Sequence, residues 1–134
     1  MKFPLFIDLK DREVLVVGCG KIGGRRADIL KSFGANVTAV DPKNGEIKRK
    51  FEDTDIENKF LVLACTDNKD LNKHIGKICR QKNILVSVAD SAEDSTFFFP
   101  ALCQSEELCI GIVSNGDKHT LVKETAAKIR RAFL

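Results

Sequence analysis

The stretch Glu13–Asp41, EVLVVGCGKIGGRRADILKSFGANVTAVD, contains the clearest signals of the fold in this chain. Its apolar run Val14–Val17 predicts a strand that is buried on both faces, as in a parallel sheet. A glycine-rich turn follows at once, and then a helical pattern that ends at Gly34. Asn36–Val40 predicts the next strand, so the stretch forms one strand–helix–strand unit. The apolar face expected for its helix contains Ile22, Ala27, Leu30 and Phe33.

Three glycines, Gly18, Gly20 and Gly23, stand in the spacing G-x-G-x-x-G between the predicted strand and the predicted helix. In this context they favour a dinucleotide site, because they permit a tight turn, a close approach of a pyrophosphate and close packing of the helix. The free N–H groups at the start of the helix attract phosphate. The alternative is a tight turn that binds no ligand.

Asp41 ends the second predicted strand, where a carboxylate accepts the ribose hydroxyls of a dinucleotide. Its charge repels a 2′-phosphate and therefore favours NAD over NADP, although the nearby Lys43 would attract such a phosphate. The expected cofactor is NAD. The residues predicted to bind it are Gly18, Gly20, Lys21, Ile22, Gly23, Asp41, Pro42, Thr66 and Asp67.

Two further apolar runs, Phe60–Ala64 and Ile84–Val88, predict strands on either side of another helix. Thr66 and Asp67 follow the first of these strands, at the sheet edge where ligands bind in open α/β folds. They are expected either to contact the cofactor or only to cap the helix. Asp90 follows the second strand at the same edge, where it is either a proton acceptor or a turn residue.

The pattern changes after residue 90. Phe97–Leu102 and Leu108–Val113 predict two strands joined by a short polar turn, and strands joined so closely must run antiparallel. A last helix is predicted from about Thr120 to Leu134, with an apolar stripe along one side.

The predicted fold class is α/β, with a Rossmann-type parallel sheet in an NAD-binding domain over residues 1–90 and a β-hairpin-plus-helix segment over residues 91–134. A hairpin and one helix bury little surface on their own, and the triplet Phe97–Phe99 needs a partner. We therefore expect residues 91–134 to be a dimerisation segment and the protein to be a homodimer. The alternative is that the three phenylalanines extend the sheet of their own subunit.

The composition is that of a globular protein: the 134 residues are 43% hydrophobic and 31% charged, with a net charge of +3. No dense basic tract accompanies that charge, so nucleic acid is not an expected partner. No apolar run is long enough for a membrane span, and the N-terminus lacks the layout of a signal peptide. The five cysteines include no C-x-x-C pair, which indicates small buried apolar residues in a reducing cytoplasm rather than a disulfide framework or a zinc site.

Several phrases of the sequence resemble the precorrin-2 dehydrogenase family, the N-terminal part of siroheme synthase. They are Pro4–Leu9, Val14–Arg26, Phe60–Asn68, and Val86–Asp90 followed by Phe97 and Pro100. The resemblance implies NAD-dependent oxidation of precorrin-2 to sirohydrochlorin in sirohaem biosynthesis, and a dimer built from the segment after the nucleotide domain. It also implies that Asp90 matches the family's essential aspartate, which removes a proton and, in bifunctional members, serves metal insertion.

The resemblance further implies that the loop after the last strand closes over the tetrapyrrole substrate. We therefore expect Ser114, Asn115, Gly116 and His119 to bind substrate, although this loop, Ser87 and residues 91–93 depart from the family pattern. The pair Arg25–Arg26 is expected to serve phosphate, substrate carboxylates or internal ion pairs.

Two other functions remain open on the sequence. A chelatase would insert Fe²⁺ or Co²⁺ into sirohydrochlorin with Asp90 and His119; no His/Cys cluster indicates a stored metal, so the ion would be a passing substrate. A non-catalytic NAD(H)-binding module is the second, because Gly18–Asp41 also resembles the regulatory domains of potassium transport systems. Those domains lack the hairpin that includes Phe97–Pro100, which argues against this alternative.

Overall fold

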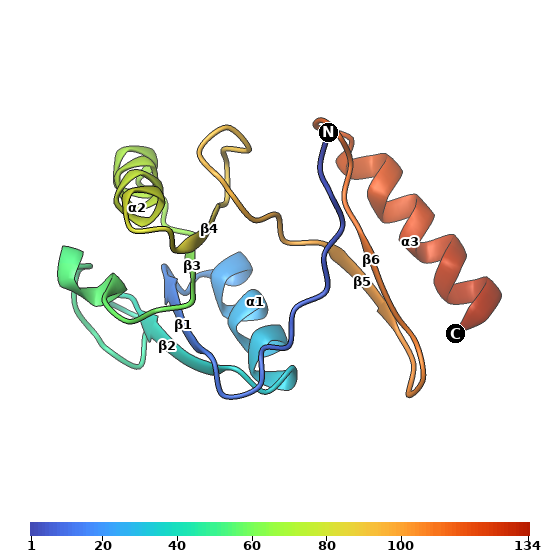
Figure 1. The fold of residues 1–134 in the computed structure, drawn as a ribbon, viewed down its shortest axis with the longest axis horizontal. Coiled ribbons are helices and arrows are strands. Elements are labelled where there is room, and N and C mark those ends of the chain that lie inside the picture. The colour runs from blue at the N-terminus through green and yellow to red at the C-terminus, as the bar shows by residue number, and fades with distance from the viewer. The chain divides into compact units, whose positions relative to one another are not determined.

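The computed structural model describes all of residues 1–134, and the chain divides into two compact units. The first unit is Ile7–Phe97, and the second combines Met1–Phe6 with Phe98–Leu134. By contacts, the division therefore falls at Phe97 rather than at Asp90, and the first six residues belong with the C-terminal segment. Figure 1 shows the elements of both units.

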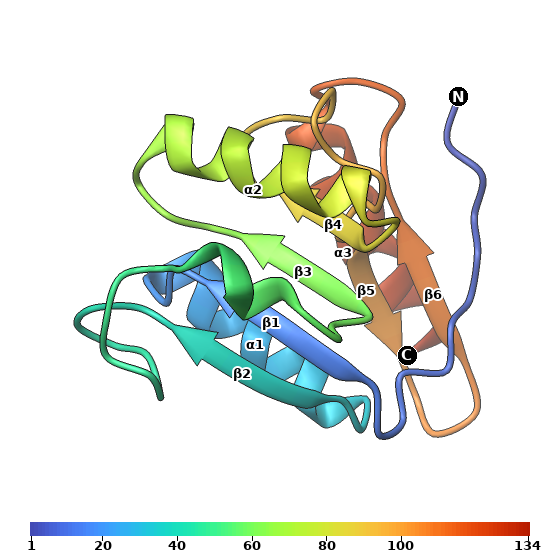
Figure 2. The same cartoon turned by 60° about the vertical axis from the view of Figure 1, so that its left-hand side comes forward.

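The first unit is a four-stranded sheet in which all neighbouring strands are parallel, as predicted (Figure 1). The strand order is β2-β1-β3-β4, so the chain builds outward from β1 in one direction and then in the other. Right-handed crossovers consequently place α1 and α2 on opposite faces of the sheet, as Figure 2 shows. The elements are β1 (Glu13–Val17), α1 (Lys21–Ser32), β2 (Asn36–Val40), the 3₁₀ turn η1 (Asp53–Ile56), β3 (Leu61–Ala64), α2 (Lys69–Gln81) and β4 (Leu85–Val88).

Local sequence signals account for the ends of both helices. The chain leaves α1 at Gly34, whose φ of +89° is a left-handed conformation that glycine adopts without strain. α2 begins after Asn68, whose side chain accepts a hydrogen bond from Leu71 N at 3.1 Å. Gly34 is the helix end that the sequence predicted, whereas the cap of α2 is Asn68, the residue directly after the predicted Thr66 and Asp67.

The core of the first unit explains the apolar sequences of its strands, because β1 and β3 are buried along almost their whole length. On α1, Ala27 and Leu30 are buried as predicted. Ile22 is 50% exposed, contrary to prediction, because it lies in the first turn, beyond the end of β1. The main cluster of buried residues consists of Leu15, Val17, Val40, Ile56, Val62, Ala64, Ile75, Cys79, Val86 and Val88.

The second unit is an antiparallel hairpin packed against one helix, as predicted. Ala101 pairs with Ile112 across the hairpin. Cys103 and Ala126 are each 1% exposed and form the contact between hairpin and helix. The elements of this unit are β5 (Ala101–Gln104), β6 (Cys109–Ile112) and α3 (His119–Phe133).

The phenylalanine triplet lies outside both sheets, so the prediction of a strand over Phe97–Leu102 is wrong in its first part. Pro100 has no N–H to donate to a ladder, and the strand begins only at Ala101. Phe97 N donates instead to Val86 O at 3.1 Å within the first unit. The phenylalanines therefore do not extend the sheet of their own subunit.

All five cysteines are free thiols, but only Cys79 and Cys103 are fully buried. Cys109 is exposed, and Cys19 and Cys65 are partly buried because they lie in turns just past the ends of β1 and β3. The expectation of uniformly buried cysteines is therefore wrong. None of the three α-helices combines the length and the apolar character that a membrane crossing requires.

Candidate functional site

The ends of the four parallel strands meet at one edge of the first unit. The register aligns Val17 with Val40 on one side and with Ala64 on the other, and it aligns Ala64 with Val88. The turns that follow these positions are therefore neighbours, and those after β1 and β4 lie roughly 10 Å apart at about 4.8 Å per strand. This is the carboxyl edge, where open α/β sheets bind ligands. In order along it come Asp41, Gly18, Cys65–Thr66 and Ala89–Asp90.

The turn after β1 is packed so tightly that two of its glycines have no room for a side chain. A Cβ on Gly18, whose φ is +90°, would lie 2.6 Å from the carbonyl of Cys65. A Cβ on Gly23 would lie 1.8 Å from the carbonyl oxygen of Gly18. Around Gly20, by contrast, a Cβ would meet no atom of the chain within 4 Å. Gly18 and Gly23 therefore shape the turn, whereas Gly20 leaves the open space against the backbone that a pyrophosphate requires.

The N-terminus of α1 suits an anion. Gly20 is the residue before the helix, no side chain caps the first turn, and that turn contains no acidic residue. Lys21 and Ile22 are exposed at this position. The free N–H groups and the positive end of the helix dipole therefore fit the phosphates of a dinucleotide.

The carboxylate of Asp41 accepts hydrogen bonds from backbone N–H groups of two turns, the one after β1 and the one after β2. Its Oδ2 accepts a hydrogen bond from Cys19 N at 2.8 Å, and its Oδ1 accepts from Lys43 N at 2.8 Å and Asn44 N at 2.9 Å. These donors, Cys19 N–H first, hold the pKa of Asp41 below its usual value, so the carboxylate is charged at neutral pH. Three of its roughly four acceptor positions are used, which leaves one on Oδ2 for a ribose hydroxyl. Pro42 follows as an exposed residue.

Asn72, which the sequence analysis did not single out, fixes the turn after β3. Its Oδ1 accepts hydrogen bonds from Thr66 N at 3.1 Å and from Thr66 Oγ1 at 2.6 Å, and its Nδ2 donates to Thr66 O at 2.9 Å. Asn68 N donates to the same hydroxyl at 3.2 Å, so Thr66 is engaged with the chain on all its polar groups. Asp67 is exposed. Asn72 is 2% exposed, so its polar groups need partners within the protein. The sequence signal that could have identified it is a polar residue one helical turn before the apolar, buried Ile75.

Asp90 is exposed in the turn that follows β4, and its carboxylate accepts no hydrogen bond from the chain. Its charge acts on the thiol of Cys65 in the neighbouring turn. Burial raises the pKa of Cys65, Arg26 of α1 opposes the rise, and Asp90 adds to it. Cys65 therefore remains a neutral thiol at neutral pH, and Asp90 is the free carboxylate in this part of the edge.

The residues predicted to bind substrate lie in the second unit, around the loop between β6 and α3. Ser114 Oγ donates to Gly116 O and accepts from Lys118 N at 3.3 Å. The N-terminal segment reaches the same loop, because Lys2 Nζ donates to Ser114 O at 2.6 Å and Lys2 N donates to Asn115 Oδ1 at 3.4 Å. Lys2, which is far from this loop in the sequence, thus contacts it through both its main chain and its side chain.

The two histidines are both on helices. His119 is the first residue of α3 rather than a loop residue, and its ring lies 3.9 Å from a carboxylate oxygen of Asp117, with both side chains almost fully exposed. His74 is on the surface of α2, with its ring nitrogen 2.9 Å from Asp53 Oδ1. No three His, Cys, Asp or Glu side chains gather into a group suited to hold a metal ion.

Comparison with known proteins shows similarity over nearly the whole chain. A family model described as putative NAD(P)-binding matches residues 5–101. The chain is 39% identical, over 97% of its length, to the "Probable multifunctional siroheme biosynthesis protein HemA" of Ruminiclostridium josui. It is 31% identical, over 95% of its length, to the "Siroheme synthase" of Thioalkalivibrio sulfidiphilus. The chain spans 28% and 29% of the lengths of these two relatives.

A solved structure, "SirC, precorrin-2 dehydrogenase", matches 99% of this chain and 72% of its own, with a TM-score of 0.83 and 27% sequence identity. The match therefore includes the hairpin and α3 as well as the parallel sheet.

Proposed function

Because the chain belongs to the putative NAD(P)-binding family that matches residues 5–101, we propose that it is a precorrin-2 dehydrogenase that uses NAD⁺ to form sirohydrochlorin in sirohaem synthesis. One observation carries most of the proposal: the similarity to a precorrin-2 dehydrogenase extends over both units, with a TM-score of 0.83. A simple nucleotide-sensing module has no need of the hairpin and α3. The names of the related proteins support the same pathway.

The residues at the carboxyl edge fit a dinucleotide. In this proposal Gly20 and the N-terminus of α1 hold the pyrophosphate, and the remaining acceptor position of Asp41 holds a ribose hydroxyl. The charge of Asp41 supports NAD over NADP, because its pKa is lowered and the carboxylate would repel a 2′-phosphate. Thr66 contributes through the shape of its turn, since its hydroxyl is bonded to Asn72.

Oxidation of precorrin-2 to sirohydrochlorin removes a hydride and a proton; the cofactor, when bound, supplies the hydride acceptor, and Asp90 is the proposed proton acceptor. The exposure of Asp90 supports this role, and so does the absence of any hydrogen bond that its carboxylate would have to break. Its turn follows β4, at the same edge as Gly20.

The substrate is a tetrapyrrole rich in carboxylates, which cations and hydrogen-bond donors recognise. We assign this recognition to the loop that contains Ser114, Asn115 and Gly116, together with His119 at the start of α3. Asn115, Gly116 and His119 are exposed, and the cationic Lys118 lies beside them. Arg25 on the surface of α1 is a further candidate.

The proposal includes a homodimer formed through the second unit. This unit exposes large apolar side chains that a monomer leaves in water, among them Phe3 (84% exposed), Leu121 (58%) and Phe133 (73%). Equilibrium sedimentation tests the dimer, and the variants Phe133→Asp and Lys128→Gln, which each lower the net charge by one, separate a loss of apolar contact from a mere change of charge on α3. We also propose that the protein is located in a reducing cytoplasm, which its five free thiols support.

The activity is tested by incubating the purified chain with enzymatically made precorrin-2 and NAD⁺ in the absence of oxygen. We expect the absorbances of sirohydrochlorin and NADH to rise together, and to rise much more slowly with NADP⁺. NAD⁺ binding without either signal would favour the regulatory module instead. Adding Fe²⁺ and sirohydrochlorin to the same preparation tests the chelatase activity that the family resemblance implies.

A further inference from the structure

We propose that Arg80 and Asp94 are positioning residues that hold the turn of Asp90 in place for proton transfer. The inference rests on the proposed function and deepens it. Asp90 itself has no side-chain hydrogen bond to orient it, so the location of its carboxylate depends on its backbone. The position of the Asp90 carboxylate is therefore set by whatever fixes the backbone of residues 89–96, the segment that follows β4.

The backbone on both sides of Asp90 is tied to strand ends. Ala89 N donates to Ala64 O at 3.0 Å, and Ser91 N donates to Val88 O at 3.0 Å. These two bonds close a tight turn at the carboxyl edge. The rest of the segment is held by side chains and by a few further backbone bonds, among them Ser95 N to Ala92 O at 3.2 Å.

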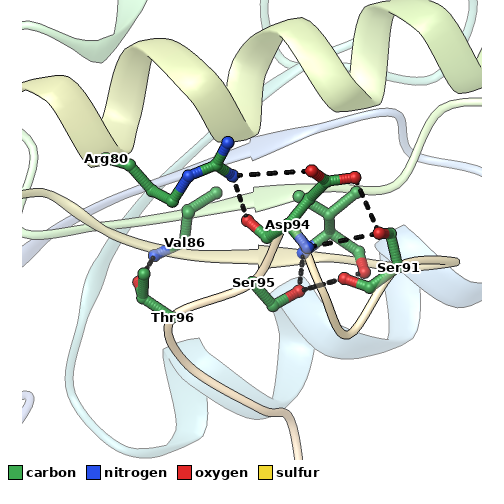
Figure 3. A network of polar contacts seen from close by, with 7 residues as sticks. Arg80, Val86, Ser91, Asp94, Ser95 and Thr96 are labelled. Carbon is green, nitrogen blue, oxygen red and sulfur yellow. Dashed lines mark hydrogen bonds and ion pairs between the residues drawn. The ribbon is translucent and has the colours of Figure 1, made fainter.

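Ser91 and Asp94 bond to each other in both directions, as Figure 3 shows. Ser91 Oγ donates to Asp94 Oδ2 at 2.7 Å, and Asp94 N donates back to Ser91 Oγ at 3.2 Å. Ser95 Oγ donates to Ser91 O at 2.7 Å and accepts from Val88 N at 2.8 Å. The residue directly after Asp90 is thus bonded through its N–H, its hydroxyl and its carbonyl.

Arg80 connects this loop to α2. Its Nη1 donates to Asp94 O at 2.5 Å and lies 3.8 Å from Asp94 Oδ1 (Figure 3). The Asp94 side chain is 15% exposed, so the pair is partly shielded from water. Gly76, one helical turn before Arg80, makes the approach possible, because a Cβ there would lie 3.1 Å from Arg80 Nη1 and 3.2 Å from Asp94 O.

The same segment also bonds to β4, the edge strand of the sheet, on the side where no further strand lies. Val86 N donates to Thr96 Oγ1 at 3.1 Å, and Thr96 N donates to Val86 O at 2.8 Å. The hydroxyl and the main-chain N–H of Thr96 therefore satisfy the backbone groups of Val86 that a further strand would otherwise pair. This gives a rigid platform for Asp90, and rigidity at this point matters because a misplacement of about 1 Å costs up to roughly a hundredfold in rate.

The test compares the wild-type chain with Asp94→Ala, Asp94→Asn and Ser91→Ala. We expect Asp94→Ala to lower kcat about tenfold or more with an unchanged Kd for NAD⁺, because the glycine turn is not part of the network. Asp94→Asn keeps an oxygen that accepts from Ser91 and is expected to retain most of kcat. Ser91→Ala removes only the hydroxyl and is expected to lower kcat without unfolding the chain.

Hydrogen exchange provides a readout that is independent of turnover. The backbone amides of residues 91 and 94 are expected to exchange faster in the Asp94→Ala variant than in the wild type. The control is Asp53→Ala, which breaks the bond between His74 of α2 and η1 and is expected to change neither kcat nor exchange at Ser91. Unchanged kcat in both Asp94→Ala and Ser91→Ala, or unchanged exchange at Ser91, would overturn the positioning role. A wild-type chain that binds NAD⁺ but leaves precorrin-2 intact would instead overturn the proposed function.

Discussion

The main-chain N–H of Cys19 donates a hydrogen bond to Oδ2 of Asp41 at 2.8 Å. The turn after β1 is therefore bonded to the carboxylate that ends β2, so the two parts of the proposed dinucleotide site are one connected structure. A change at Asp41 is expected to act on cofactor binding directly and also through the glycine turn.

Asp41→Ala is expected to weaken NAD⁺ binding by about 10- to 100-fold, because it removes a charged acceptor and leaves three backbone N–H groups without their partner. Calorimetric titration measures the effect. Asp28→Ala, a change of an exposed carboxylate on α1, serves as the control and is expected to leave affinity unchanged. Equal affinities for NAD⁺ in wild type and Asp41→Ala would remove Asp41 from the site.

Three glycine-to-alanine changes should have three different outcomes. Gly23→Ala places a Cβ 1.8 Å from Gly18 O and should destabilise the fold by roughly 3 kcal/mol. Gly20→Ala meets no atom of the chain, so it should cost less than about 1 kcal/mol yet weaken NAD⁺ binding strongly. Gly24→Ala meets Cys19 O only at 3.7 Å and should stabilise α1 by about 0.5–1 kcal/mol without affecting NAD⁺. Urea unfolding and calorimetry together distinguish the three, and tight NAD⁺ binding by Gly20→Ala would contradict the assignment of the pyrophosphate.

Asp90→Ala is expected to keep NAD⁺ binding and to abolish NADH formation from precorrin-2. The exposed carboxylate makes no hydrogen bond, so stability should change by less than about 0.5 kcal/mol. Asp90→Asn keeps the size of the side chain but loses its basicity, and should be equally inactive. Normal turnover in either variant would show that another group accepts the proton.

Asn72→Ala is expected to destabilise the first unit by about 1–3 kcal/mol, because Thr66 N and Thr66 O lose buried partners. NAD⁺ affinity should fall as well, since the Cys65–Thr66 turn packs against Gly18. Asn72→Asp retains acceptors for Thr66 N and Oγ1 and should recover part of both losses. Thermal unfolding with and without NAD⁺ measures the two effects, and full affinity in Asn72→Ala would show that the turn keeps its shape unaided.

Stability should fall in acid partly through Asp55. The bidentate hydrogen bonds from Arg49, 2.9 and 2.7 Å long, are the main reason that the pKa of Asp55 lies below its usual value. The stabilisation from a lowered pKa is complete above about pH 4, the unfolded value, and is lost as the pH falls through the folded value. Asp55→Asn should therefore show a flatter decline of unfolding free energy below about pH 4 than the wild type. Asp28→Asn is the control, and identical acid profiles for Asp55→Asn and wild type would contradict the expectation.

Much of the fold was predictable because its signals are local. The buried run Val14–Val17, the terminating Gly34 and the capping Asn68 each act within a few residues of where they stand. The strand expected at Phe97 is wrong because two features interrupt its apolar pattern. Pro100 cannot pair in a sheet, and the backbone N–H of Phe97 donates to Val86 O, eleven positions earlier, which is a contact that no local pattern shows.

The parallel sheet, the glycine turn and the carboxylates at the strand ends can be read from the amino-acid sequence alone, because hydrophobic period and backbone freedom are properties of short segments. Three features depend on the folded chain: Gly20 faces open space while Gly23 packs against a carbonyl, Asp41 keeps one acceptor position free, and Asn72, Arg80 and Asp94 hold the turns beside them. Those facts depend on which donors and acceptors from distant segments come within about 3 Å of one another, and no local pattern encodes that distance.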